Sequence, residues 1–86
     1  MTHAPMTQVT LYGKPGCCLC DEARAEVEAV RAGRPFELTE VDVSIDPRLW
    51  SAYGERIPVL EIDGEAAFEL HVDRSELARR LDTVRL

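Results

Sequence analysis

The sequence predicts an α/β domain in which helices flank a four-stranded mixed sheet, with the elements in the order β-α-β-α-β-β-α. Two observations carry this prediction. Segments in which apolar and polar residues alternate, as in strands, interchange with segments in which apolar residues recur every three or four positions, as in helices. In addition, Asp63 and Gly64 stand between two strand-like segments and are typical of a tight hairpin turn. The 86 residues suffice for one domain with a modest core.

The first half of the chain predicts a strand, a helix and a second strand. Residues 1–7 show no such pattern, and we expect a flexible tail ahead of a domain that covers residues 8–86. Val9–Tyr12 is a β-prone run, the helical pattern extends from Cys18 to about Ala32, and alternation returns in Phe36–Val43. The stripe expected to face the core consists of Leu19, Ala23, Val27 and Val30. Because such a connection is a right-handed crossover, the two strands should be parallel.

The second half predicts a short helix, a hairpin and a final helix. Asp46 is the expected N-cap of the short helix because a proline follows it in the first turn. The strand-like segments Ile57–Ile62 and Glu65–Leu70 flank the hairpin turn, so they should pair antiparallel. Asp73 or Ser75 can cap the last helix. The apolar residues expected to pack on the sheet are Trp50 and Tyr53 of the short helix and Leu77 and Leu81 of the last one.

Charge and hydropathy argue against several classes of function. A net charge of −6 lacks the basic surface that nucleic acids require, and it does not favour an anionic membrane surface. No run approaches the roughly 20 apolar residues that a membrane span requires. Residues 1–7 also lack the basic and apolar segments of a signal peptide. We therefore expect a cytoplasmic protein without nucleic-acid or membrane partners, in a compartment that keeps thiols reduced.

The chemistry-bearing feature is a cluster of three cysteines, Cys17, Cys18 and Cys20, at the start of the first helix. A thiol at this point lies near unpaired backbone N–H groups and the positive end of the helix dipole, both of which favour the thiolate. Cys20 lies three residues after Cys17 and therefore on the same helical face, within reach of a disulfide. The C-x-x-C pair thus predicts a redox function.

Two other interpretations of the cysteines stay open. They could bind zinc or a shared iron–sulfur cluster without turnover, although zinc prefers four ligands and the chain adds only the distant His3 and His71. They could also be unreactive thiols of a scaffold that binds a partner without chemistry. Cys18, adjacent to Cys17, is more simply interpreted as a thiol that takes no part in the chemistry than as a third reactive cysteine.

The order of elements and two motifs resemble the thioredoxin superfamily, and within it the small glutaredoxin-like proteins. The motifs are Leu11–Ala23 (LYGKPGCCLCDEA) and Arg56–Gly64 (RIPVLEIDG), and the similarity extends from Gln8 to Leu81. The resemblance implies a thioredoxin-like fold and a thiol–disulfide oxidoreductase. In that family the position of Cys17 is the nucleophile and that of Cys20 the resolving cysteine, which releases the substrate from a mixed disulfide.

The resemblance also assigns binding roles. Pro58 matches a cis proline that leaves the backbone of Ile57 free to pair with a substrate or glutathione strand. Lys14 matches a lysine that helps hold the thiolate and a glutathione carboxylate, and Asp73 is the candidate for the acidic group that grips the glutathione amine. The implied partners are a disulfide-bonded protein or a glutathione mixed disulfide, with glutathione or a thioredoxin system as reductant. No metal or resident cofactor is implied; glutathione would be a co-substrate.

The chain departs from the glutaredoxin pattern at two places. Cys18 and Leu19 replace the usual Pro-Tyr between the two cysteines. The stretch Glu69–Asp73 lacks the Gly-Gly pair that glutaredoxins carry after the hairpin. The resemblance therefore supports the Cys17–Cys20 redox pair more directly than it supports glutathione as the reductant.

Overall fold

A computed structural model describes residues 7–84 of the chain. The elements are β1 (Gln8–Gly13), α1 (Cys18–Gly33), β2 (Glu37–Asp42), the 3-10 turn η1 (Val43–Ile45), α2 (Pro47–Tyr53), β3 (Val59–Ile62), β4 (Glu65–Glu69) and α3 (Arg74–Val84). This order confirms the prediction and adds the short turn η1. Residues 1–6 of the expected tail and residues 85–86 of the expected domain lie outside the described residues. Between residues 7 and 84, no helix combines the length and the apolarity needed to cross a membrane.

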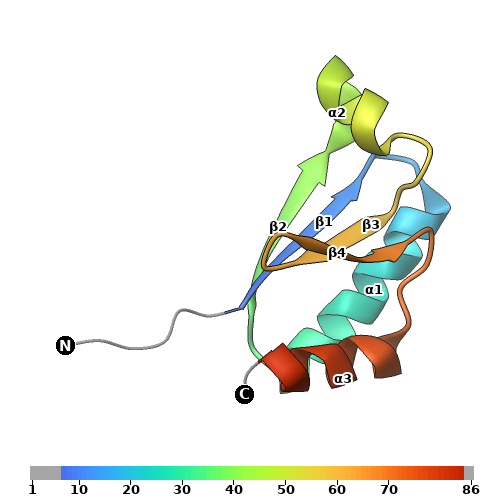
Figure 1. Cartoon of the computed structure of the whole chain (residues 1–86). Helices are drawn as coiled ribbons and strands as arrows, with labels where there is room; N and C mark the ends of the chain where they lie inside the picture. The colour runs from blue at the N-terminus through green and yellow to red at the C-terminus, as the bar shows by residue number, and fades with distance from the viewer. Residues whose placement is uncertain (1–6, 85–86) are drawn as a thin grey trace.

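The four strands form one mixed sheet in the order β2-β1-β3-β4 (Figure 1). β1 and β2 are parallel, as the crossover through α1 requires, and their pairing starts with Gln8 opposite Glu37. β3 runs antiparallel to both β1 and β4. The turn between β3 and β4 has φ of 51° at Asp63 and 88° at Gly64, the two left-handed conformations of a type I′ hairpin.

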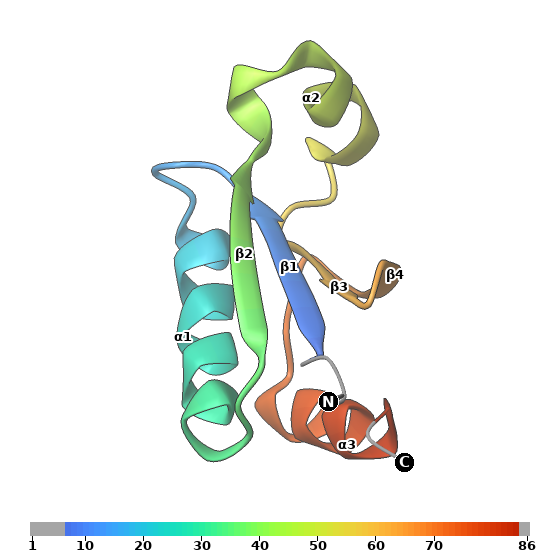
Figure 2. The ribbon, with the colours of Figure 1, turned by 90° about the vertical axis from the view of Figure 1, so that its left-hand side faces the viewer.

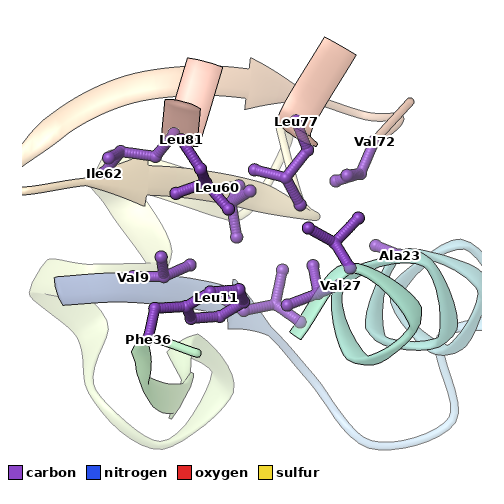
Figure 3. Packing of buried hydrophobic residues seen from close by; sticks show 11 residues of the cluster. Val9, Leu11, Ala23, Val27, Phe36, Leu60, Ile62, Val72, Leu77 and Leu81 are labelled. Carbon is purple, nitrogen blue, oxygen red and sulfur yellow. The ribbon is translucent and has the colours of Figure 1, made fainter. Parts of the chain in front are cut away.

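Helices α1 and α3 pack on one face of the sheet, and the main core lies between them and the strands (Figure 3). Every buried side chain in this cluster is at most 7% exposed, which makes apolar burial the main source of stability. The cluster consists of Val9 and Leu11 from β1, Leu60 and Ile62 from β3, Ala23, Val27 and Val30 from α1, Leu77 and Leu81 from α3, and Phe36 and Val72 from connections.

Helix α2 stands beyond the carboxyl ends of β1 and β2, away from α1 (Figures 1 and 2). It begins as predicted, because Asp46 Oδ1 accepts a hydrogen bond of 2.8 Å from the backbone N–H of Arg48. Tyr53, at its end, stacks on Tyr12 of β1 with ring centroids 4.1 Å apart. Both hydroxyls donate to Glu61 of β3, so α2 contacts the sheet face opposite the main core.

Two apolar residues lie where the sequence did not place them. Leu19 is 48% exposed, and the buried face of α1 includes Cys20 instead. The reason is that Leu19, in the first turn of the helix, faces the connection between β4 and α3. Trp50 is 45% exposed and does not cover the sheet; its ring lies against Gly54, where a Cβ would come within 2.6 Å of it. The seven-residue α2 is too short to bury both of its aromatic side chains.

Candidate functional site

The site begins at the turn between β1 and α1. Gly16 adopts φ of 76°, which lets the chain reverse before the helix. Cys17 follows as the N-cap of α1, and its Sγ accepts a hydrogen bond of 3.2 Å from the backbone N–H of Cys20. The sulfur therefore satisfies one of the N–H groups that the helix start leaves unpaired. Cys17 as a residue is half-buried.

Cys20 lies beneath Cys17 and is only 2% exposed. It forms a small second core with Val43 and Ile57, against which Cys17 packs. Burial and, to a smaller extent, a hydrogen bond with the Cys17 side chain together raise the pKa of the Cys20 thiol to about 11, although the backbone N–H of Lys14 opposes them. The two sulfurs thus have different environments although they share one face of the helix. Cys18 is exposed, and all three cysteines are free thiols.

The segment before β3 lies next to the two cysteines. The peptide bond between Ile57 and Pro58 is cis, the isomer that the resemblance implies. The side chain of Ile57 is buried against Cys20, and within residues 7–84 its backbone N–H and C=O form no hydrogen bond. The N–H of Leu70 donates to the carbonyl of Pro58 over 2.8 Å, which links this segment to the end of β4.

The other two expected binding residues are in different surroundings. The Lys14 ammonium lies 5.6 Å from the centre of the Trp50 ring, a cation–π contact, and only its backbone N–H bonds to Cys20. Asp73 accepts a hydrogen bond of 3.2 Å from the backbone N–H of Ser75 and so stands at the start of α3. The structure therefore brings Cys17, Cys20 and Ile57 into one cluster and leaves Asp73 in the separate role of a helix cap.

The comparison with known families identifies the domain. A model of the family described as glutaredoxin-like domain (DUF836) matches residues 8–82. The chain belongs to this family. An uncharacterized protein from Mycobacterium tuberculosis is 28% identical to this glutaredoxin-like chain over 81 residues, 84% of either protein.

Solved structures agree with this assignment. A structural genomics target protein from X. campestris is 36% identical to this glutaredoxin-like domain, with a TM-score of 0.73 over 87% of this chain and 96% of that one. A protein from Nitrosomonas europaea, 22% identical, superposes with a TM-score of 0.76 over 93% of this chain and 96% of its own. A thioredoxin from Halobacterium salinarum, 24% identical, gives 0.68 over 92% of this chain and 74% of that chain. The comparison with this thioredoxin establishes the thioredoxin-like fold.

Sequence reasoning missed two features of the glutaredoxin-like site. One is Gly13, where a Cβ would lie 3.0 Å from the Cys20 Sγ, so glycine makes room for the buried thiol. The stacked Tyr12 and Tyr53 were not expected to pack against the Cys20 cluster with Glu61 between their hydroxyls. Burial, followed by hydrogen bonds with Tyr53 and with the Glu61 carboxylate, raises the pKa of Tyr12 above its ordinary value. The sequence signal for this arrangement was Glu61, a charged residue within the apolar strand β3.

Two open grooves of this glutaredoxin-like domain lie along α1. The larger, about 370 Å³, lies between the β1–α1 turn and the end of β2, with Lys14 and Cys20 on its wall and an Arg24–Glu40 ion pair across it. The smaller lies between α1 and the β4–α3 connection and is lined by Leu19 and Leu70. Across residues 7–84, no three cysteine, histidine or acidic side chains converge in a way that could hold a metal ion.

Proposed function

We propose that the protein is a thiol–disulfide oxidoreductase that reduces protein disulfides or glutathione mixed disulfides with Cys17 as nucleophile and Cys20 as resolving thiol. The observation that carries this proposal is the contrast between the two sulfurs. Cys17 is half-buried at the start of α1, and its Sγ accepts the N–H of Cys20, whereas Cys20 is buried in the cluster against which Cys17 packs. Membership of the glutaredoxin-like family supports the same chemistry.

The reaction balances in two exchanges. The Cys17 thiolate attacks one sulfur of the substrate disulfide, forms a mixed disulfide with it, and releases the other substrate sulfur as a thiolate that takes up a proton. Cys20 then loses its proton and attacks the Cys17 sulfur, which closes the Cys17–Cys20 disulfide and releases the second substrate thiol. The protein has then given up two electrons. An external dithiol, such as a thioredoxin system, or two molecules of a monothiol, such as glutathione, would reduce the Cys17–Cys20 disulfide again.

The contacts of the site support distinct roles for the two cysteines and for the segment before β3. At the helix start the Cys17 Sγ accepts the backbone N–H of Cys20, which fixes the position of the attacking sulfur. The unpaired backbone groups of Ile57 can receive an extended substrate segment as an added strand. Lys14 and Asp73 remain candidates for contacts with the carboxylate and amine of glutathione.

Three single variants test the proposal. Cys17→Ser should abolish reduction of a disulfide-bonded protein by the purified enzyme, whereas Cys18→Ser, the matched control, should retain it. Cys20→Ser should stop after the first exchange and accumulate a mixed disulfide, which mass spectrometry detects as a substrate adduct on Cys17. Full turnover by Cys17→Ser, or no reduction of either a protein disulfide or a glutathione mixed disulfide by the wild-type protein, would contradict the proposal.

A further inference from the structure

Two large apolar side chains are exposed at the smaller groove, one from the start of α1 and one from the end of β4. Leu19, two residues after Cys17, is 48% exposed, and Leu70, after β4, is 52% exposed. Both line the same groove, and Ala23 and Val72, each 2% exposed, also line it. Exposed large apolar side chains that share a groove next to a reactive group are typical of a binding surface.

The backbone at Leu70 adds a second observation. Its φ is 67°, a left-handed conformation that suits glycine or asparagine and is unfavourable for leucine. Hydrogen bonds from its N–H to the carbonyls of Pro58 and Arg56 hold it there, at 2.8 Å and 3.2 Å. These hydrogen bonds link one wall of the groove to the segment that carries the unpaired backbone of Ile57.

The negative charge at the groove indicates which kind of molecule can bind there. Glu22 lines the groove, and in the part of the chain that the structure describes it has no ion pair or hydrogen bond. Glu26, on the same helix, is instead held by Arg74 at 2.9 Å. The groove thus offers apolar contact together with an uncompensated carboxylate, on a chain whose net charge is −6. Glutathione carries two carboxylates against one amine and matches this surface poorly, whereas a basic polypeptide segment complements it.

We propose that the groove formed by Leu19, Leu70 and Glu22 docks a segment of a disulfide-bonded protein substrate that carries an aliphatic residue and a lysine or arginine close to its cysteine. The aliphatic side chain packs between the two leucines, the cation pairs with Glu22, and the substrate backbone continues toward Ile57. The inference rests on the proposed oxidoreductase function and specifies its substrate class: polypeptide rather than glutathione.

Binding can be measured without sulfur chemistry. Four extended peptides in which serine replaces the cysteine, and which carry leucine or serine together with lysine or glutamate at neighbouring positions, are titrated into the reduced wild-type protein and followed by NMR. The leucine–lysine peptide should bind most tightly. Glu22→Gln should weaken that peptide about two- to fivefold, as for an exposed ion pair, and Glu22→Lys should reverse the preference between lysine and glutamate.

A second variant tests the apolar contacts in the groove. Leu70→Asn keeps a residue that tolerates the left-handed backbone and should weaken both leucine-containing peptides about five- to tenfold. Glu65→Gln and Ile45→Asn are matched controls, because Glu65 lies at the far end of β4 and Ile45, 79% exposed, lies in η1. Neither should change any affinity.

The outcomes separate this inference from the proposed function. Equal affinity for the four peptides, tighter binding of glutathione than of any peptide at Leu19 and Leu70, or burial of the groove in a dimer of this chain would overturn the docking proposal. If the peptides are discriminated as expected but the wild-type protein reduces no disulfide, the groove is a docking site and the oxidoreductase function is wrong. If disulfides are reduced without discrimination among peptides, the reverse holds.

Discussion

Removal of the buried thiol by Cys20→Ala should change how the stability of the protein depends on pH. The side chain is 2% exposed, and its pKa is raised from 9.0 to about 11, mainly by burial. The folded state therefore binds the thiol proton more tightly than the unfolded state. A group with a raised folded-state pKa contributes stability that is fully present below the unfolded pKa and is lost as the pH rises through the folded one. The window for this loss is pH 9 to pH 11.

The size of the loss follows from the two pKa values. Since one pKa unit corresponds to about 1.4 kcal/mol, full ionisation of Cys20 costs the folded state about 3 kcal/mol. At pH 10.5 the loss is already about 2 kcal/mol, because most of the unfolded chains but few of the folded ones have then lost this proton. Such a loss is a large fraction of the stability of a small domain.

The measurement is urea unfolding of the reduced wild-type protein and of the Cys20→Ala variant at a series of pH values from 8 to 10.5. Cys20→Ala changes packing as well as titration, so its stability at pH 8 is offset, and the informative quantity is the difference between the two proteins as a function of pH. This difference should shift by about 2 kcal/mol in favour of the variant. Cys18→Ala, which removes an exposed thiol, should follow the wild-type curve. Parallel curves for wild type and Cys20→Ala would refute the argument that burial controls this thiol.

Three further variants test the packing that holds the site. Gly13→Ala would place a Cβ 3.0 Å from the Cys20 Sγ and should cost about 1–3 kcal/mol in urea unfolding, whereas Gly33→Ala, with nothing within 4 Å, should cost far less. Phe36→Ala, at a residue 2% exposed, should lower the free energy of unfolding by about 3–5 kcal/mol, and a smaller loss would mean that the core refills the cavity. Asp46→Ala removes the N-cap of α2 and should cost about 1 kcal/mol, seen as a lower midpoint in the same experiment.

The fold could be predicted from sequence wherever the signal is local. Asp63 and Gly64 identify the hairpin because few other residues tolerate two successive left-handed conformations. Asp46 identifies the start of α2 because its carboxylate reaches an N–H two residues later. The crossover rule then fixes β1 and β2 as parallel. The antiparallel pairing of β1 with β3 does not follow from these signals, because it joins segments far apart in the chain.

Which side chains of a helix are buried was harder to predict, because this depends on how the helix is placed against the sheet. Leu19 and Cys20 are adjacent in α1, and the apolar periodicity favours Leu19 as the core residue, yet Cys20 is buried and Leu19 is exposed. In the same way, Trp50 is the largest apolar side chain of α2 and still lies at the surface. The spacing of the cysteines predicts the pair, but the different environments of its two sulfurs come from tertiary packing, including the close approach of Gly13.

These environments suggest why the two exchanges of the proposed reaction occur in order. In the free dithiol, burial and the Cys17 side chain both raise the pKa of Cys20, so this thiol stays protonated while Cys17 reacts. Once Cys17 is bonded to a substrate sulfur, it no longer carries a negative charge that would hold the proton on Cys20. The contribution of Cys17 to the raised pKa then disappears, whereas the opposing hydrogen bond from the backbone of Lys14 remains. Ionisation of Cys20 becomes easier at the step that requires it, so that the formation of the mixed disulfide itself prepares the resolving attack.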